Sequence, residues 1–350
     1  MEITVIIMKK LVVMVLIIVQ CLALFSSCGT NEKSPDKKLV IGFSMATFKE
    51  DRWLRDRDIF TAKAKQDGFD VIVSNANNDA DLQYKQVNDM IKKGIDILVI
   101  VPHDCNLAVS CVNLAKKSDI PVISYDRLVR SANIDAYISF DNVKVGELQA
   151  EALLKAVPTG GYLIINGSEN DNNSKMFREG YMNILNSHIE NKEITIVNET
   201  WVQDWRRETA FSFVSNELKV NSDKIQGIIA ANDSLAWGTI DALSEAKMTG
   251  KIQVVGHDAD LAACQRIVDG TQLLTIYKPI KTLVDETVNA CNDLVNDKPL
   301  KYTETINNGT YDVPYLKIGV IPVTKDNIDE TVIKDGFQLK EDVYRDSVTD

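Results

Sequence analysis

The feature that most restricts the fold of this sequence is a repeated alternation of short apolar runs with amphipathic segments. In residues 227–261, one apolar run ends at Asn232-Asp233, an amphipathic segment follows to Met248, and a second apolar run ends at His257-Asp258. This pattern predicts a strand, a helix and a strand. Ligands of open α/β sheets bind beyond the carboxyl ends of the strands, so these polar endings are candidate site residues.

The same alternation fills most of the chain from residue 39 onward. Outside residues 227–261, Val- and Ile-rich runs predict strands at 39–45, 70–75, 97–101, 121–127, 137–141, 162–165, 195–197 and 273–277. Continuous apolar strands between helices are typical of parallel sheets covered on both faces. The 350 residues exceed the usual size of one core. We therefore expect an α/β fold with two doubly wound parallel-sheet lobes. The chain should leave the first lobe near Asp141-Asn142 and return to it after Lys278.

The N-terminus has the pattern of an export signal. Lys9-Lys10 precede an apolar run over residues 11–25, and small residues follow. Residues 1–27 are therefore predicted to be a secretory signal peptide, because the apolar run is shorter than the ~20 residues of a membrane span. Met8 is an alternative start to Met1.

Cys28 directly follows the small residues Ser26 and Ser27, which resembles the lipobox of bacterial lipoproteins. The resemblance implies that Cys28 is lipidated and that the polar residues 28–38 form a tether. The expected location is the periplasm or cell surface, anchored to the membrane. A transmembrane anchor and a soluble secreted protein remain the alternatives.

Composition and motifs exclude several functions. The net charge is −11 and there is no basic block, so nucleic acid is not an expected partner. Three scattered histidines give no zinc-ligand spacing, and Cys105, Cys111, Cys264 and Cys291 are expected to be buried free thiols. The sequence has no G-x-S-x-G, no G-x-G-x-x-G after its first strand and no phosphate-binding G-x-x-x-x-G-K. We expect neither an enzyme nor a cofactor.

The residues at the predicted strand ends and in nearby loops suit a ligand with vicinal hydroxyls. Carboxylate, amide, guanidinium and ammonium groups supply the donors and acceptors, and two tryptophans can cover the faces of a sugar ring. The candidates are Arg52, Trp53, Asp126, Arg127, Asp171, Asn173, Trp205, Asn232, Asp258 and Lys278. Purely structural alternatives are a local Asp126–Arg127 ion pair, a helix cap at Asn232 or Asp233, and a core position for Trp53.

Several stretches carry a resemblance to a known family. They include Arg52-Trp53 followed by Asp-Arg-Asp-Ile-Phe60, Ser124-Tyr-Asp-Arg127, Tyr137-Ile-Ser-Phe-Asp-Asn142, Asp171-Asn-Asn173, Trp201-Val-Gln-Asp-Trp205, Ala231-Asn-Asp233, Asp258-Ala-Asp-Leu261, Tyr277-Lys-Pro-Ile280 and Thr331-Val-Ile-Lys-Asp-Gly-Phe337. The chain resembles the type I periplasmic sugar-binding family from residue 39 onward, and within it the branch that binds D-xylose for ABC transporters. The loop 46–51, His103 and His257 depart from that pattern.

The resemblance implies a role for each candidate. Trp53 and Trp205 would sandwich the pyranose, while Arg52, Asp126 and Arg127 would hold hydroxyls from the first lobe. Asp171, Asn173, Asn232 and Asp258 would do so from the second lobe, with Lys278 near the hinge. A three-strand hinge would divide the chain into a first lobe of 39–142 plus 278–308 and a second lobe of 143–277 plus 309–350.

The expected function is therefore a monomeric, lipid-anchored solute-binding protein that captures D-xylose between its lobes and delivers it to an ABC transporter permease. Hinge closure over the sugar would signal the loaded state. The alternatives are a sensing subunit that docks on a membrane kinase or chemoreceptor, and a binder of ribose, arabinose or glucose. A repressor of the same fold is disfavoured, because the residues before 39 have the pattern of an export signal and do not resemble a basic helix-turn-helix.

Overall fold

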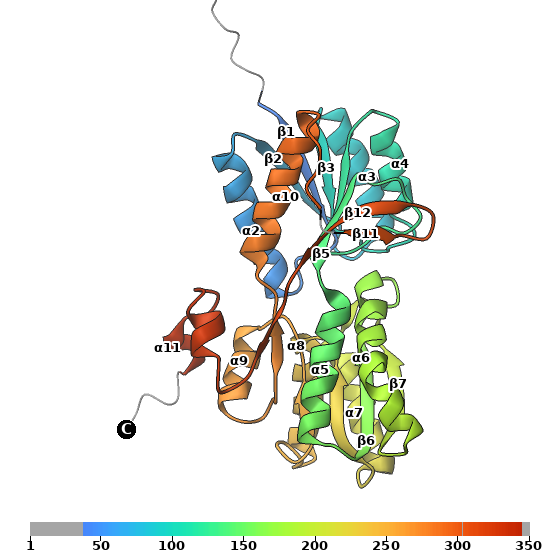
Figure 1. Ribbon diagram of the computed structural model, residues 1–350, viewed down its shortest axis with the longest axis vertical. Helices are drawn as coiled ribbons and strands as arrows, with labels where there is room; N and C mark the ends of the chain where they lie inside the picture. Colours follow the sequence, from blue (N-terminus) through green and yellow to red (C-terminus); the bar gives the residue numbers. More distant parts are fainter. Residues whose placement is uncertain (1–37, 303, 345–350) are drawn as a thin grey trace, which may run out of the picture. The chain divides into compact units, whose positions relative to one another are not determined.

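A computed structural model describes residues 38–302 and 304–344 of the chain. It confirms the predicted α/β architecture, with two mainly parallel sheets flanked by helices (Figure 1). We call the larger sheet and its helices the first lobe, and the smaller sheet and its helices the second lobe. The predicted signal peptide and the lipidation site Cys28 lie outside the described residues.

The first lobe contains a seven-stranded sheet in the order β11-β12-β5-β4-β3-β1-β2. Its strands are β1 (Val40–Met45), β2 (Asp70–Asn75), β3 (Ile97–Ile100), β4 (Val122–Tyr125), β5 (Ala136–Phe140), β11 (Glu304–Asn307) and β12 (Asp312–Ile318). All neighbours pair in parallel except β11 and β12, which are antiparallel. The strand order reverses at β1, which is where open α/β sheets form ligand sites.

Helices cover both faces of this sheet. They are α2 (Asp51–Gln66) and α10 (Ile280–Val295) on one face, and α3 (Ala80–Lys92) and α4 (Val109–Lys116) on the other. Within β3, Ile97 and Val99 pack toward α2 and α10, whereas Leu98 and Ile100 pack toward α3 and α4. Burial on both faces explains the uninterrupted apolar strands. Figure 1 shows α10 running alongside α2, although the two are distant in sequence.

The second lobe contains a four-stranded parallel sheet in the order β7-β6-β8-β9. Its strands are β6 (Gly160–Asn166), β7 (Ile194–Trp201), β8 (Ile225–Ala230) and β9 (Gln253–Val255). A bridge between Val255 and Leu274 connects it to β10 (Thr275–Tyr277), which pairs with β13 (Ile321–Val323). The helices are α5 (Asn142–Ala156), α6 (Asn172–Glu190), α7 (Arg207–Asn221), α8 (Asp233–Glu245) and α9 (Leu261–Val268), with a short 3₁₀ turn at Gln203–Trp205.

One boundary differs from the sequence prediction. Residues 309–350 were assigned to the second lobe, but β12 pairs with β5 in the sheet of the first lobe. The Tyr315 ring stacks on Tyr137 with centroids 4.7 Å apart, and its hydroxyl donates to the Phe140 carbonyl at 2.7 Å. Pro314 interrupts the strand pattern, and proline is a poor strand residue. The chain therefore leaves the first lobe after Ile318 rather than near Asn308.

The C-terminal segment packs onto the second lobe. A π-helical turn (Asp329–Ile333) and α11 (Lys340–Val343) share a small apolar cluster with Cys264 and Tyr277. All four cysteines of the described chain, Cys105, Cys111, Cys264 and Cys291, are buried free thiols. None of the helices formed by residues 38–302 and 304–344 has the length and apolarity that crossing a membrane requires.

Candidate ligand-binding site

A cavity with about 320 Å³ of empty space lies where residues of both lobes meet. All ten residues that the sequence analysis selected line it: Arg52, Trp53, Asp126, Arg127, Asp171, Asn173, Trp205, Asn232, Asp258 and Lys278. They come from many separate segments, so the fold brings together what the sequence keeps apart.

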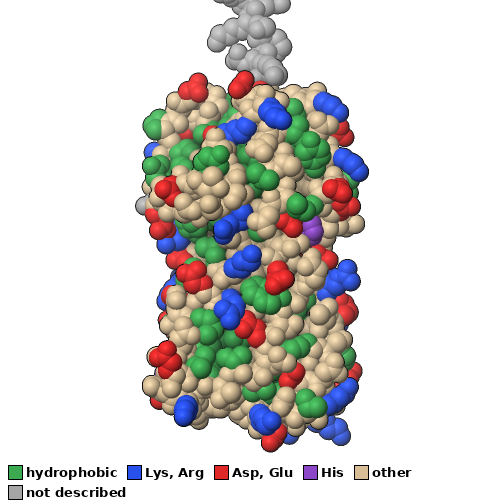
Figure 2. Space-filling model, turned by 90° about the vertical axis from the view of Figure 1, so that its right-hand side faces the viewer, with side chains coloured by type: hydrophobic (Ala, Val, Ile, Leu, Met, Phe, Trp, Pro, Cys, Tyr) green, Lys and Arg blue, Asp and Glu red, His purple; other side chains and the backbone are tan. Residues whose placement is uncertain are grey.

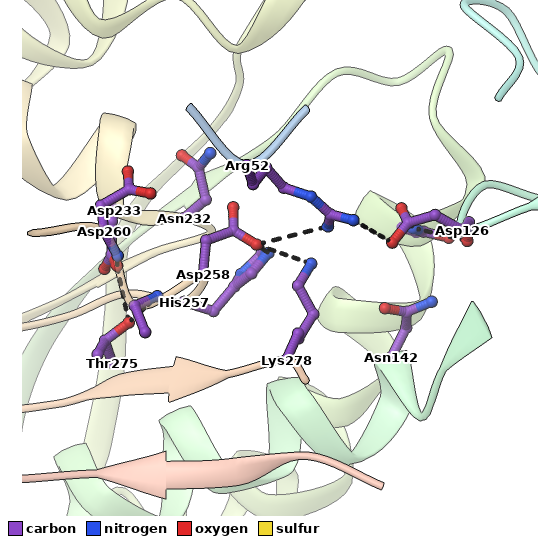
Figure 3. A network of polar contacts seen from close by, with 12 residues as sticks. Arg52, Asp126, Asn142, Asn232, Asp233, His257, Asp258, Asp260, Thr275 and Lys278 are labelled. Carbon is purple, nitrogen blue, oxygen red and sulfur yellow. Dashed lines mark hydrogen bonds and ion pairs between the residues drawn. The ribbon is translucent and has the colours of Figure 1, made fainter. Parts of the chain in front are cut away.

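Arg52 occupies the centre of the polar network (Figure 3). Its Nη2 lies 2.9 Å from Oδ2 of Asp126 in the first lobe, and its Nη1 lies 3.6 Å from Oδ1 of Asp258 in the second lobe. Asp56, one helical turn further along α2, approaches Nε of Arg52 to 3.4 Å. The Tyr125 hydroxyl donates to Asp56 at 2.5 Å. Arg52 is thus fixed from behind by Asp56 and from both sides by cavity carboxylates.

Asp126 sits just beyond β4 in the left-handed backbone region, with φ of 59°. Its carbonyl accepts hydrogen bonds from Ser139 Oγ at 2.5 Å and from the Tyr137 hydroxyl at 3.0 Å. Asn173 of the second lobe donates through Nδ2 to Oδ1 of Asp126 at 3.1 Å. Burial alone would raise the pKa of Asp126, but the nearby Arg52 guanidinium holds that pKa below its ordinary value. The carboxyl is therefore an ionised acceptor.

Asp258 follows β9 with φ of 102°, another unfavourable backbone conformation at the site. Lys278 Nζ lies 2.8 Å from Oδ1 of Asp258. Burial opposes ionisation of Asp258, but Lys278 and neighbouring groups hold its pKa well below the ordinary range. The adjacent His257 is buried, and desolvation lowers its pKa to about 3. His257 is therefore neutral at physiological pH, and Asp258 is charged.

Arg127 and Asp171 form the third ion pair of the cavity, with Nε and Oδ2 separated by 2.8 Å. Asp171 also caps α6 by accepting a hydrogen bond from the Asn173 amide. Burial raises the pKa of Asp171 although Arg127 acts against the shift. Each of the three cations of the cavity thus has one carboxylate within 3 Å: Arg52 has Asp126, Arg127 has Asp171, and Lys278 has Asp258.

Two tryptophans line the cavity from different lobes. The guanidinium of Arg52 lies 4.1 Å above the Trp53 ring, and that of Arg127 lies 5.1 Å from it. Trp53 is only 3% exposed and packs in the core of the first lobe while it also contributes to the cavity wall. The two alternative roles considered for Trp53 are therefore compatible.

Trp205 is held in the second lobe by its aromatic neighbours. Phe177 and His257 meet its ring nearly edge-on, with centroids 6.5 and 6.4 Å away. A Cβ added at Gly167 would lie 2.1 Å from the Trp205 ring, so this close approach requires glycine. Within the described residues, the buried Nε1 of Trp205 has no hydrogen-bond partner. A bound molecule can supply the missing acceptor.

Asn232 and Asp233 have separate roles. Asn232 caps α8 by accepting from the Leu235 amide at 3.0 Å, and its side chain also lines the cavity. Asp233 instead accepts from Thr275 Oγ1 at 2.7 Å and from Gln272 Nε2 at 2.8 Å in a buried network behind the cavity. Burial raises the pKa of Asp233 to about 7. The Asp233 carboxyl thus connects the start of α8 to residues at and before β10, whereas Asn232 lines the cavity.

Three further lining residues were not selected from the sequence: Glu50, Phe177 and His257. Phe177 lies four positions after Asn173 on α6, so the helical repeat could have placed it on the same face. His257 directly precedes Asp258 at the end of the same apolar run, but only Asp258 was kept as a candidate, and His257 was noted as a departure from the family pattern. Glu50 belongs to the loop 46–51, which was noted for the same reason.

The chemistry of the cavity suits a small neutral ligand with many hydroxyls. Its carboxylates accept hydrogen bonds, its cations and amides donate them, and the two indoles offer apolar surface. In the described part of the chain, no group of three or more His, Cys, Asp or Glu side chains is arranged to hold a metal ion. On the face shown in Figure 2, acidic and basic side chains are interspersed.

The sequence matches the model of a known protein family. Residues 41–299 match the model of the periplasmic binding protein domain. The chain belongs to the periplasmic binding protein family. This is a family of binding proteins rather than enzymes, as the sequence predicts. Homologous periplasmic binding proteins are exported to the periplasm, whereas the signal peptide predicted for residues 1–27 stays a prediction.

This periplasmic binding protein is 42% identical to the D-xylose-binding periplasmic protein of Haemophilus influenzae over 94% of this chain and 98% of the relative. It is also 42% identical to the D-xylose-binding periplasmic protein of Escherichia coli, over 90% and 95% of the two chains. Among solved structures, a carbohydrate transporter solute-binding protein from Chloroflexus aurantiacus in complex with D-glucose superimposes with a TM-score of 0.82 at 29% identity, covering 87% of this chain and 98% of that one.

Proposed function

We propose that this chain is a solute-binding protein that captures D-xylose in the cavity between its lobes. The observation that carries the proposal is the cavity itself, where two tryptophans and three buried ion pairs from both lobes surround a space of about 320 Å³. The two relatives at 42% identity are both named for D-xylose. A pentose has the hydroxyls that the charged groups need.

The binding energy would come from charge-assisted hydrogen bonds and from aromatic burial. Each hydrogen bond to a charged group contributes about 1.5–3 kcal/mol net, and a micromolar complex needs about 8 kcal/mol. The carboxylates of Asp126 and Asp258 would accept from sugar hydroxyls, while Arg52, Arg127 and Lys278 would donate. Their mutual ion pairs hold these groups in position before the sugar arrives, which reduces the entropy cost of binding.

Closure of the lobes would distinguish the sugar-loaded protein from the empty protein. Ion pairs cross between the lobes, among them Arg52 with Asp258 at 3.6 Å and Arg127 with Asp171 at 2.8 Å. A sugar that contacts both lobes favours the closed arrangement, since it binds that arrangement better than an open one. The crossovers near Asn142 and Lys278, with the third after Ile318, would form the hinge.

We further propose that the closed, loaded form delivers the sugar to an ABC transporter permease, and that a lipid on Cys28 keeps the monomeric protein at the membrane. The predicted signal peptide and lipobox support the anchor, and the names of the related transport proteins support the permease. Membrane vesicles that contain the cognate permease should hydrolyse ATP faster when both this protein and D-xylose are present. Equal stimulation without the sugar would contradict delivery of a loaded form.

Calorimetry on residues 29–350 with D-xylose, ribose, arabinose, glucose and galactose tests the sugar assignment. We expect binding of D-xylose with at least micromolar affinity and a matching rise in melting temperature by mass action. If another sugar binds more tightly than D-xylose, the cavity remains the proposed binding site but that sugar replaces D-xylose as its ligand. Absence of binding for all five sugars would contradict the proposed function.

A further inference from the structure

Glu50 contributes a fourth carboxylate to a cavity that has three cations. It lies immediately before α2, two positions ahead of Arg52. Asp126, Asp171 and Asp258 already match the cations one to one, and Glu50 forms no ion pair with any described residue. Its Oε2 is buried and has no hydrogen-bond partner in residues 38–302 and 304–344. The cavity therefore holds a buried acceptor, Glu50 Oε2, to which none of the described residues donates a hydrogen bond.

A structural role for the Glu50 side chain does not account for this arrangement. A residue directly before a helix often caps it, but the Glu50 side chain makes no capping hydrogen bond to α2. Only its backbone carbonyl takes part, by accepting from the Trp53 amide at 3.0 Å. Burial raises the pKa of Glu50, and the positive charges of Arg127 and Lys49 counteract only part of the shift. An unpartnered buried acceptor costs stability, and such costs are concentrated at functional sites.

The neighbouring residue Lys49 fixes this segment against the opposite lobe. Its Nζ donates to the carbonyls of Asp204 and Trp205, at 3.2 and 3.4 Å. On its own side, the Lys49 amide donates to Thr47 Oγ1 at 3.1 Å. The segment that carries Glu50 is thus attached both to its own loop and to the turn that presents Trp205. This attachment holds the Glu50 carboxylate at the cavity when the lobes are together.

We propose that Glu50 is a specificity-determining residue whose carboxylate accepts a hydrogen bond from one hydroxyl of the bound sugar. This inference rests on the proposed function and adds a ligand contact to it. The unpartnered Oε2 can accept a hydrogen bond, so a sugar hydroxyl at this position supplies the donor that it lacks. A sugar with an ether oxygen or a bare CH₂ there leaves Oε2 buried and unpartnered, and the cavity therefore discriminates against it.

The first test compares Glu50→Leu and Glu50→Gln with Asp51→Asn as a matched control. Asp51 is the exposed neighbour of Glu50, and it does not line the cavity. Glu50→Leu should weaken D-xylose binding by about tenfold or more, the loss expected for a hydrogen bond to a charged group. Glu50→Gln keeps an acceptor oxygen and should lose less, while Asp51→Asn should bind as the wild type does. Unchanged affinity in Glu50→Leu would overturn the proposal.

Melting temperature without sugar separates a ligand contact from a structural role. Because the Glu50 side chain forms no hydrogen bond or ion pair with residues 38–302 or 304–344, Glu50→Leu should melt at the same temperature as the wild type or higher. A clear loss of melting temperature together with the loss of affinity would show that Glu50 supports the fold, and it would contradict the proposal.

A set of singly deoxygenated xyloses identifies the hydroxyl. One of them should bind wild type and Glu50→Leu with nearly equal affinity, because it lacks the group that Glu50 accepts. An equal penalty from Glu50→Leu for every deoxy sugar would contradict a direct contact. If wild type binds no sugar at all, the proposed function fails. If wild type binds D-xylose and Glu50→Leu does so equally well, only the inference about Glu50 fails.

Discussion

Arg127 and Asp171 form a buried ion pair between the lobes, with Nε 2.8 Å from Oδ2 and side chains only 7% and 2% exposed. Arg127 follows β4 of the first lobe, and Asp171 caps α6 of the second lobe. Both residues line the cavity, so the ion pair can form only when the two lobes are close together. Its loss leaves a buried carboxylate without its cation, which is more costly than loss of a surface pair.

Arg127→Ala should weaken D-xylose binding by about 3 kcal/mol or more, because Asp171 then loses its buried partner and a donor leaves the cavity. Arg178→Ala is the matched control. Arg178 pairs with Glu199 at 2.6 Å but is 39% exposed, so its removal should change affinity by less than about 0.5 kcal/mol. Calorimetry measures both variants. Equal affinities for Arg127→Ala and the wild type would remove this pair from the binding mechanism.

Trp205→Ala should reduce the affinity for D-xylose by about 2 kcal/mol or more while the protein remains folded, because the sugar loses an aromatic wall. Trp237→Ala provides the comparison, since Trp237 is 42% exposed on α8 and stacks on Arg207 outside the cavity. Titration with the sugar, together with circular dichroism, separates binding from folding. A Trp205→Ala protein that is folded and binds normally would place the sugar elsewhere.

The buried carboxyl of Asp233 should make stability depend on pH. Its pKa is raised by burial to about 7, so between about pH 4 and 7 the native state holds more protons than the unfolded state. The free energy of unfolding should therefore contain a contribution that falls as pH rises through this window. Asp233→Asn should reduce the slope of the profile measured by chemical denaturation at a series of pH values, and the adjacent Asp260, whose pKa burial also raises, contributes the remainder.

Asp241→Asn is the control for this profile, because Asp241 lies on the same helix but is 43% exposed. Its profile should follow that of the wild type. The slope with pH is the relevant quantity, since the amide in Asp233→Asn also loses an acceptor for Thr275 or Gln272. A wild-type slope in Asp233→Asn would contradict the raised pKa.

Cys28→Ser should release the exported protein from the membrane fraction, because no thiol then remains to carry the lipid. Cys21→Ser changes a cysteine inside the predicted signal peptide and should leave the protein attached. Fractionation followed by immunodetection measures both. Persistent attachment of Cys28→Ser would exclude Cys28 as the anchor.

Much of the fold follows from local sequence pattern. The apolar runs that end at Asp126 and Asn232 predicted parallel strands, and the polar residues after them line one cavity, because parallel strands carry their carboxyl ends to the same edge. The remaining candidates, such as Trp205 and Asp171, were selected as residues of nearby loops, and the resemblance to a family implied a role for each. Local pattern alone does not place these residues, since each lies in a loop or at a helix start.

Contacts between residues that are distant in sequence could not be predicted from the sequence. The position of β12 depends on its partner β5, and Pro314 concealed the strand. Glu50 was missed because its importance comes from the lack of a hydrogen-bond partner for its side chain among the described residues, which no spacing rule reveals. The pairing of Arg127 with Asp171 likewise requires two lobes to meet. Local pattern therefore predicts elements and their polar ends, whereas contacts between lobes require the structure.

The most direct test of the central claim is a crystal structure of residues 29–350 with D-xylose. We predict the pyranose ring in the cavity between the indoles of Trp53 and Trp205, with its hydroxyls within hydrogen-bonding distance of Arg52, Asp126 and Asp258. An empty cavity at saturating D-xylose, or the sugar bound at another place, would contradict the account.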